Sequence, residues 1–378
     1  MNTTEGDMLT DWNNKLTNNY VVNNVFLFLY LFLGIIGNVL VIIIYNFRMT
    51  KKKDDRYFIP FLAVMDLFAC IFRSSLELAM NFNPVNFQGS ALCKSVWFPT
   101  NFFAISSILL LLVIAIQRYL KICRPFGPQM TLMRKRFALG ACVSTAIAFS
   151  IPLIFYNEEI KVFNLDKNIT GFVCDIDLER YYGVGFLTYT VIVLLSSLGI
   201  MIALTVCNIL IGRTICFQIK AKHKRNMKKE PYQHVNSFSP LVLINITPDT
   251  NEDIPEPDMK SLIKLPETTR THTNNDLQTS SPDEKPKYLK KMAFAHRYSF
   301  MFMLIGVAFI ISYFPRLIIL AITFYDPKFF GKISDTQLAL VAFSREMNVI
   351  NNVVNPFIYG FFDRKFRKES KKLICCQS

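Results

Sequence analysis

The stretch LLLLVIAIQRYLKICRPFG (residues 109–127) decides the fold, because eight consecutive apolar residues run almost directly into an arginine. Arg118 keeps its proton in a protein, so its helix must bring it to water or to polar partners inside a bundle. The apolar block around it, residues 95–120, is long enough to cross roughly 30 Å of hydrocarbon. This block therefore predicts a membrane-spanning helix with a fixed positive charge at one end.

Six more apolar blocks of this kind occur in the 378-residue chain, 52% of which is hydrophobic. They cover residues 21–47, 57–82, 137–156, 182–217, 299–324 and 336–362. The chain is too apolar to be disordered, and the blocks lack the alternation of a membrane β-barrel. We therefore predict an all-α integral membrane protein, a bundle of seven transmembrane helices.

The segments between the blocks alternate in charge. Residues 48–56 and 121–136 each carry five basic residues, and six basic residues follow Phe362. Residues 157–180 carry six acidic residues against three basic ones. Because basic loops stay on the cytoplasmic side, we expect a plasma-membrane protein with its N-terminus outside and its C-terminus inside. The net charge of +14 then faces the lipid bilayer's inner leaflet, and no nucleic-acid partner is expected.

The predicted organisation has five parts. They are an extracellular tail (1–20), helices one to five (21–217), a long cytoplasmic loop (218–290), helices six and seven (291–361), and a short amphipathic eighth helix with a cytoplasmic tail (362–378). The long loop is rich in Pro, Ser, Thr and acidic residues, so we expect it to be disordered, with helical extensions at its ends.

Several cysteine and asparagine residues lie where this topology allows a disulfide or a covalent modification. Cys93 precedes the third block and Cys174 lies in the loop before the fifth, both in the oxidising compartment, so we expect a disulfide between them. The expected modification sites are palmitoylated Cys375 and Cys376 at the inner surface and glycosylated Asn2 and Asn168 outside.

Polar stripes run along three of the blocks. In the second block Asp66, Arg73 and Glu77 share one helical face with Cys70. The sixth and seventh blocks carry similar stripes: Phe309, Tyr313, Arg316 and Leu320, and Arg345, Asn348, Asn352, Asn355 and Tyr359. Charges inside a membrane are costly and usually mark function, so we expect a polar bundle interior.

Taken in order, these motifs resemble those of the rhodopsin-like (class A) G-protein-coupled receptors, most of all the peptide receptors. The resemblance covers residues 21–372. It rests on GN at 37–38, LAVMD ending at Asp66, Cys93 with Cys174, QRY at 117–119, FIISYFP ending at Pro315, NPFIY at 355–359, and the amphipathic stretch FFDRKFRKE at 361–369.

The resemblance implies a signalling receptor and not an enzyme. An outside ligand would change the packing of the sixth helix against the third and fifth, and the inner face would then accept a heterotrimeric G protein. Arrestin and receptor kinases are further implied partners. The implied switch residues are Gln117, Arg118, Tyr119, Asn355, Pro356 and Tyr359.

The resemblance also implies an allosteric sodium ion, and no other cofactor is expected. The implied sodium ligands are Asp66, Ser107, Asn351 and Asn355, together with Asn38. The alternative is a protonated Asp66 held in a polar hydrogen-bond network, because a buried carboxylate needs either a proton or a cation.

Two positions exclude particular classes of ligand. Thr100 replaces the aspartate of amine receptors, and Val349 replaces the Schiff-base lysine of light receptors, so neither class is expected. Residues 161–175 predict a β-hairpin lid, which in this family is typical of peptide receptors. The expected ligand-binding residues are Glu77, Thr100, Tyr313, Arg316 and Arg345. For Glu77, an internal salt bridge with Arg73 is an equal alternative.

Gln117 departs from the family, which usually has an acidic residue before the arginine, and Ala295 stands near the place of the acidic partner on the sixth helix. We therefore expect raised basal signalling unless other contacts compensate. Two alternatives stay open: a receptor-like scavenger or partner protein that couples to no G protein, and a receptor for a small non-amine ligand. The sequence lacks the repeats of a transporter and the HExxH or GxSxG motif of an intramembrane enzyme.

Overall fold

The computed structural model of the chain describes residues 4–49, 56–165, 167–177, 180, 183–227, 284–326 and 329–374. Asn2, Cys375, Cys376 and most of the predicted loop 218–290 lie outside the described residues. The chain divides into two compact units, residues 1–216 with 293–378, and residues 217–292. The helical bundle and its polar sites belong to the first unit.

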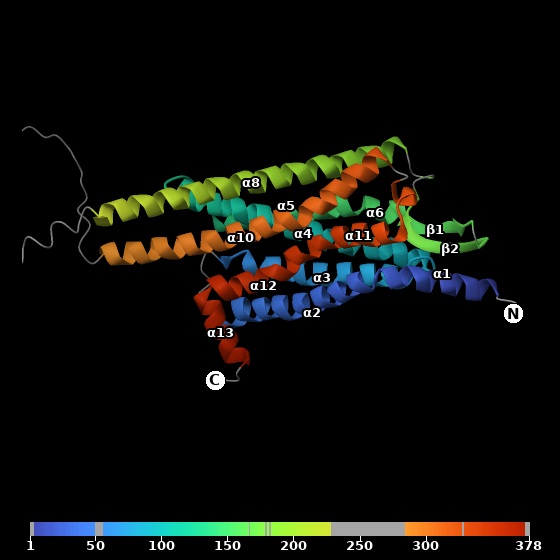
Figure 1. Cartoon of the computed structure of the whole chain (residues 1–378). Helices are drawn as coiled ribbons and strands as arrows, with labels where there is room; N and C mark the ends of the chain where they lie inside the picture. Colours follow the sequence, from blue (N-terminus) through green and yellow to red (C-terminus); the bar gives the residue numbers. More distant parts are fainter. Residues whose placement is uncertain are drawn as a thin grey trace, which may run out of the picture. The chain divides into compact units, whose positions relative to one another are not determined.

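Helices make up most of the described chain. In order, the elements are α1 (Glu5–Asn19), α2 (Val21–Ile43), η1 (Ile44–Arg48), α3 (Ile59–Phe82), α4 (Ser90–Cys123), α5 (Leu132–Ser150), α6 (Pro152–Tyr156), β1 (Asn157–Asn164), β2 (Ile169–Ile176), α8 (Val184–Met227), α10 (Glu284–Tyr325), η3 (Phe329–Lys332), α11 (Asp335–Glu346), η4 (Met347–Val349), α12 (Ile350–Phe362) and α13 (Arg364–Ile374) (Figure 1). The end of the bundle that carries the two strands is called the hairpin end, and the opposite end is called the α13 end.

The predicted helical bundle is confirmed. Within the described residues, six helical segments are long and apolar enough to cross a membrane. These are α2 with η1, α3, α4, α5 with α6, α8 and α10. The seventh predicted block is divided, because the 3-10 turn η4 separates α11 from α12, yet the three follow one another without a break from Asp335 to Phe362.

Residues 5–19, expected as part of a tail, form the helix α1. Thr4 begins it with a capping box, in which its hydroxyl accepts the Asp7 N–H and the Asp7 carboxylate accepts the Thr4 N–H. The buried Asn13 amide donates to the Phe82 carbonyl at the end of α3 over 3.0 Å. Its oxygen accepts the Val85 N–H over 3.4 Å. These bonds fix α1 against the hairpin end.

The predicted hairpin is present. Strands β1 and β2 are antiparallel, with Asn157 opposite Ile176. The chain before α4 lies along β2, where the Phe172 N–H donates to the Val85 carbonyl over 2.7 Å and the Phe87 N–H donates to the Phe172 carbonyl over 2.9 Å. Gly171 permits this approach, because a Cβ atom there would lie 2.5 Å from the Val85 oxygen.

Close packing of small residues holds the helices together. A Cβ atom on Gly37 would lie 2.8 Å from the ring of Pro356, so α2 and α12 meet at the GN motif. The largest cluster of buried apolar side chains draws on several helices and includes Val41, Leu62, Leu110, Ile114, Leu204, Met301, Ile305 and Phe309. Large apolar side chains such as Phe32, Leu195 and Ile311 are exposed, as contact with lipid tails requires.

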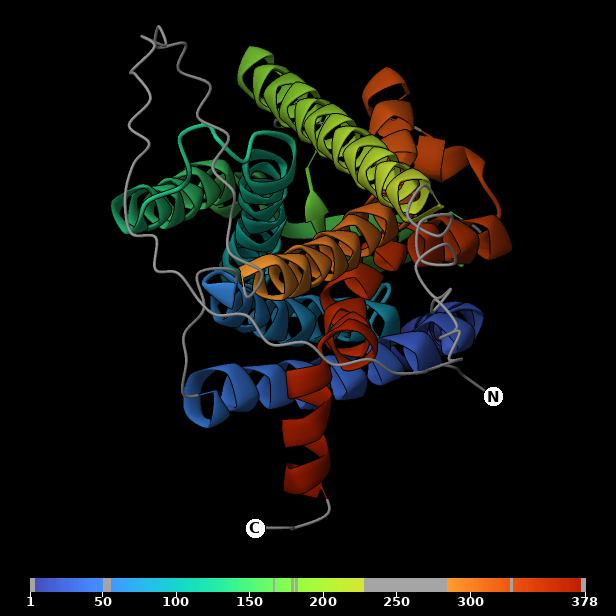
Figure 2. The same cartoon turned by 90° about the vertical axis from the view of Figure 1, so that its left-hand side faces the viewer.

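The helix α13 follows α12 in a new direction (Figures 1 and 2). Phe366 is its buried anchor and stacks on Tyr45, with the ring centroids 5.8 Å apart. Its basic residues Arg364, Lys365, Arg367, Lys368, Lys371 and Lys372 are exposed. This apolar and basic division confirms the predicted amphipathic eighth helix.

Candidate functional site

A cavity of about 500 Å³ lies at the hairpin end, between α3, α4, α5, α8, α10, α11 and the hairpin. Its size falls within the range of roughly 300–1,000 Å³ that is typical of small-molecule pockets. The charged groups that line it are Arg73, Asp175, Arg316 and Arg345. Most of the remaining wall is apolar, so the cavity suits a ligand that offers both apolar and charged groups.

The charged and apolar parts of the cavity lie at different depths. On α10, Arg316 and Phe309 both line the cavity and are seven residues apart, about 10 Å along the helix. Phe309 is the one nearer the α13 end, together with Ile108 and Leu109 of α4. A ligand that enters from the hairpin end therefore meets the arginines before the apolar floor.

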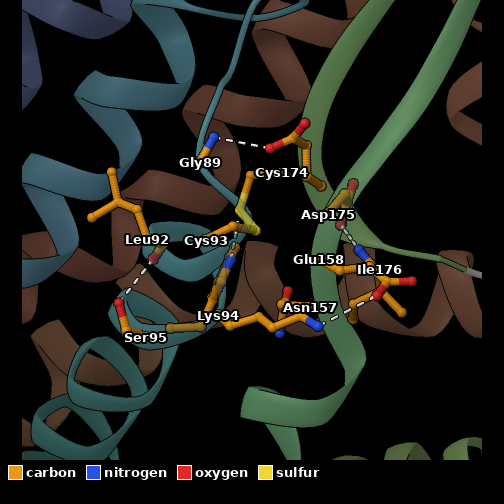
Figure 3. Close-up of a disulfide and its surroundings, with 12 residues drawn as sticks. Gly89, Leu92, Cys93, Lys94, Ser95, Asn157, Glu158, Cys174, Asp175 and Ile176 are labelled. Carbon is orange, nitrogen blue, oxygen red and sulfur yellow. Dashed lines mark hydrogen bonds and ion pairs between the residues drawn. A yellow bond between two sulfur atoms is a disulfide. The ribbon is translucent and has the colours of Figure 1, made fainter.

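The disulfide predicted between Cys93 and Cys174 is confirmed, with the two Cα atoms 5.7 Å apart. Figure 3 shows how it joins β2 to the first turn of α4, and how Lys94 reaches toward Glu158 of β1. That ion pair measures 3.6 Å. Because Asp175 follows the disulfide and lines the cavity, the hairpin is fixed in place as part of the cavity wall.

Glu77 is not among the residues that line the cavity, and its ligand-binding role stays a prediction. Its side chain is 1% exposed and forms an ion pair with Arg73, four residues away on the same helix. Arg345 approaches the second carboxylate oxygen, with 3.7 Å between Nη2 and Oε2. The alternative of an internal salt bridge is therefore what the structure contains, because two guanidinium groups enclose this buried carboxylate.

Thr100 is not among the residues that line the cavity either, and its assignment as a ligand-binding residue stays a prediction. It is buried, and its hydroxyl donates to the Val96 carbonyl of the preceding turn over 2.8 Å, which satisfies it within its own helix. Tyr313, Arg316 and Arg345 do line the cavity. The Arg316 side chain forms no hydrogen bond or direct ion pair with the described residues, and the Glu77 carboxylate attracts it from a longer distance.

A second polar site lies midway along the bundle, around the fully buried Asp66. Ser107 of α4 donates to Asp66 Oδ1 over 2.5 Å, and Asn355 of α12 donates to Oδ2 over 2.7 Å. Asn351 is connected to this site through Asn352. The Asn352 Oδ1 atom accepts from the Asn351 amide over 3.4 Å and lies 3.5 Å from the Ser107 hydroxyl. Within the described chain, the buried side-chain oxygens of Asn351 and Asn355 accept no hydrogen bond. This set of oxygen atoms fits a hard cation such as sodium.

Near the α13 end, Arg118 is 1% exposed and lies under an aromatic ring. Its guanidinium carbon is 4.8 Å from the centroid of Phe302, a residue of α10. The same ring lies 6.5 Å from that of the buried Tyr359 on α12. A cation over an aromatic face is a favourable contact, so α10 covers the arginine.

The other predicted switch residues surround this contact on two helices. Gln117 is buried on α4, whereas Tyr119 is partly buried and packs beside Ile122. Asn355 and Pro356 are buried on α12, one turn before Tyr359. The structure therefore brings the predicted residues of α4 and α12 to the same region, with Phe302 between Arg118 and Tyr359.

The sequence analysis missed a buried cluster at the α13 end. Arg56 and Asp363 form an ion pair of 2.8 Å, and both are nearly inaccessible to solvent. Tyr45 donates to the Asp363 carboxylate over 2.7 Å. One signal was available, because an aspartate directly before a basic amphipathic stretch is typical of a helix N-cap. Asp363 does accept the backbone N–H groups of Lys365 and Phe366.

The comparisons with known proteins agree with this architecture. The family described as 7 transmembrane receptor (rhodopsin family) matches residues 37–359. Probable G-protein coupled receptor No18 of Amphibalanus amphitrite is 24% identical over 354 residues, which cover 90% of this chain and 86% of that protein. Cholecystokinin receptor type A of Oryctolagus cuniculus is 26% identical over 204 residues, 52% of this chain and 47% of that protein.

A likeness in three dimensions extends over nearly the whole chain. The crystal structure of squid rhodopsin superposes with a TM-score of 0.61 at 16% identity, and covers 96% of this chain and 88% of that one. At this identity the likeness concerns the fold alone.

The Glu77→Gln variant tests the internal ion pair. Without the carboxylate, the guanidinium groups of Arg73 and Arg345 lose their shared counter-charge, and breaking a buried pair costs roughly 3–5 kcal/mol. We expect a clearly lower midpoint of thermal unfolding in detergent micelles. The control is Asp326→Asn, which breaks an exposed pair with Lys332 and should change the midpoint little. Equal midpoints for the two variants would contradict the assignment.

Proposed function

Since the chain belongs to the rhodopsin family of seven-transmembrane receptors, we propose that it binds an extracellular peptide in the cavity and activates a heterotrimeric G protein at the α13 end. The chain is a membrane-spanning receptor and not an enzyme. The basic segments next to its apolar blocks support a plasma-membrane orientation with the hairpin end outside and the α13 end in the cytoplasm.

One observation carries the proposal: a ring of α10 covers the buried Arg118. In this closed arrangement the guanidinium group is inaccessible to a cytoplasmic protein. If the inner end of α10 moves away, Phe302 leaves both Arg118 and Tyr359. The arginine can then meet the G protein, and Tyr359 loses the ring that limits its rotation. The ligand would act by favouring this second packing of α10.

The cavity supports a peptide ligand with an acidic group or a terminal carboxylate. Glu77 pairs with Arg73 and lies 3.7 Å from Arg345, whereas Arg316 lines the cavity without a direct ion pair among the described residues. A carboxylate that binds a guanidinium group forms a strong, charge-assisted hydrogen bond. The apolar floor around Phe309 would accept an apolar side chain next to that group. Similarity to the cholecystokinin receptor supports a peptide ligand, without indicating its charged group.

The oxygen atoms around Asp66 are proposed to hold a sodium ion in the resting receptor. Asp66 would supply the negative charge, and Ser107, Asn351 and Asn355 would supply neutral oxygens. The ion would neutralise a carboxylate that is otherwise costly to bury. By neutralising Asp66, the ion would stabilise the packing of the helices in the resting receptor.

The Arg118→Ala variant tests the coupling. Cells that express the chain would be exposed to a peptide library, with dissociation reporters for several G proteins and with arrestin recruitment measured in parallel. We expect a peptide response in at least one G-protein reporter, reduced at least tenfold by Arg118→Ala at equal surface expression. The control is Arg136→Ala, an exposed arginine at the start of α5. Arrestin recruitment without any G-protein signal would support the non-coupling alternative instead.

The Arg316→Gln variant tests the ligand assignment with the active peptide from that screen. Arg316 lines the cavity without a direct ion pair among the described residues, so its loss should lower potency at least tenfold and leave the maximal response intact. Lys332→Gln, which removes an exposed cation outside the cavity, should not change potency. Equal potency of wild type and Arg316→Gln would remove Arg316 from the site.

The sodium site is tested by thermal unfolding in sodium chloride and in choline chloride at equal ionic strength. Sodium should raise the unfolding midpoint of the wild type, because it binds only the folded receptor. Asp66→Asn and Ser107→Ala should lose this difference. Ser106→Ala, which removes a neighbouring buried hydroxyl, should keep it. A wild-type midpoint that is identical in the two salts would favour a protonated Asp66.

A further inference from the structure

The buried cluster at the α13 end joins four segments of the bundle. Tyr45 comes from η1, Arg56 from the chain before α3, Tyr298 from α10, and Asp363 from the junction of α12 and α13. All four side chains are buried. Only Tyr298 belongs to the helix that, in the proposed function, moves during signalling.

Asp363 is well satisfied without α10. The Arg56 Nη2 atom lies 2.9 Å from Oδ1 and 2.8 Å from Oδ2. Tyr45 donates to Oδ2 over 2.7 Å, and the N–H groups of Lys365 and Phe366 donate to Oδ1 over 3.0 and 3.3 Å. These five contacts join η1, the chain before α3 and α13 into a fixed unit that needs no group from α10.

Tyr298 adds a contact that can be released. Its hydroxyl donates to Asp363 Oδ2 and accepts from Arg56 Nε, the latter over 2.7 Å. Its ring also lies beside the Arg56 guanidinium, 5.2 Å from its carbon to the ring centroid. If Tyr298 leaves, the ion pair and the other donors remain, so no buried charge is left without a partner. The cluster is therefore compatible with two positions of α10, as a switch requires.

Tyr298 lies on the same helix as Phe302, whose ring covers Arg118. Phe302 follows Tyr298 by four residues, so both side chains lie on the same face of α10. Tyr298 contacts the fixed unit, and one turn further on Phe302 lies over the arginine. As long as the hydroxyl of Tyr298 is bound, the ring of Phe302 is held over the guanidinium group.

We infer that Tyr298 is a positioning residue that keeps the inner end of α10 on the bundle in the resting receptor, through its hydroxyl contacts with Asp363 and Arg56. The inference rests on the proposed function, because it assigns the restraint that signalling must release. It also supplies a compensating contact for the neutral Gln117 and for the acidic partner missing from α10 near Ala295. Ligand-free signalling of the wild type should therefore be low.

The Tyr298→Phe variant removes the hydroxyl and keeps the ring. A hydrogen bond to a charged group shifts an equilibrium roughly ten- to a hundredfold, so the variant should raise the ligand-free population of the released position of α10. The matched control is Tyr57→Phe. Tyr57 lies next to Arg56, and its hydroxyl has no hydrogen bond among the described residues.

Two readouts distinguish the restraint of α10 by Tyr298 from coupling to a G protein. The first is the distance between spin labels at Arg297→Cys on α10 and Phe126→Cys in the exposed loop after α4, in a background whose other reactive cysteines are serine. The second is ligand-free nucleotide exchange on a panel of purified G proteins by the unlabelled variants. The first readout needs no G protein, and the second reports the proposed function directly.

We expect a longer-distance population in Tyr298→Phe that is at least twice that of the wild type and of Tyr57→Phe, with faster exchange on at least one G protein. Identical distance distributions in Tyr298→Phe and wild type would overturn the inference, and so would an equal shift in both Tyr→Phe variants. A longer distance without exchange on any G protein would support the restraint by Tyr298 and contradict the proposed coupling to a G protein.

Discussion

A charge that leaves water needs a partner, and this constraint organises the interior of the bundle. Near the hairpin end, the Glu77 carboxylate lies between two arginines. Midway, Asp66 accepts a hydroxyl and an amide. At the α13 end, Asp363 pairs with Arg56. The Glu77 and Asp363 carboxylates are each paired with an arginine, whereas Asp66 accepts neutral donors and needs a proton or a cation.

The helix α10 connects the outer and inner layers. Tyr313 and Arg316 line the cavity, and Phe309, stacked 5.1 Å from Tyr313, closes its floor. Further along the same helix, Phe302 covers Arg118 and Tyr298 contacts Asp363. A ligand that changes the position of α10 at the cavity therefore acts on a continuous element whose other end holds the arginine.

The sequence predicted what depends on period and composition. Seven apolar blocks predicted the spans, two cysteines in the oxidising compartment predicted the disulfide, and extended residues on both sides of a polar turn predicted the hairpin. It could not place contacts between distant segments: Asp363 and Arg56 are 307 residues apart. It also could not decide whether Glu77 faces a ligand or Arg73, because one helical face supports both. The sequence also did not reveal that the Thr100 hydroxyl bonds to its own helix.

The neutral Gln117 shows that the groups that hold Arg118 cannot be identified from its neighbours in the sequence alone. An acidic neighbour would hold Arg118 by charge, and its absence from the sequence suggests a loose switch. In the structure the ring of Phe302 lies over the arginine, and the helix that carries this ring is bound by the Tyr298 hydroxyl to an ion pair on other elements. A cation–π contact binds less specifically than a charged pair, so its geometry must be fixed from elsewhere. The restraint has thus moved from the arginine's neighbour in sequence to the next turn of α10, where Tyr298 supplies it.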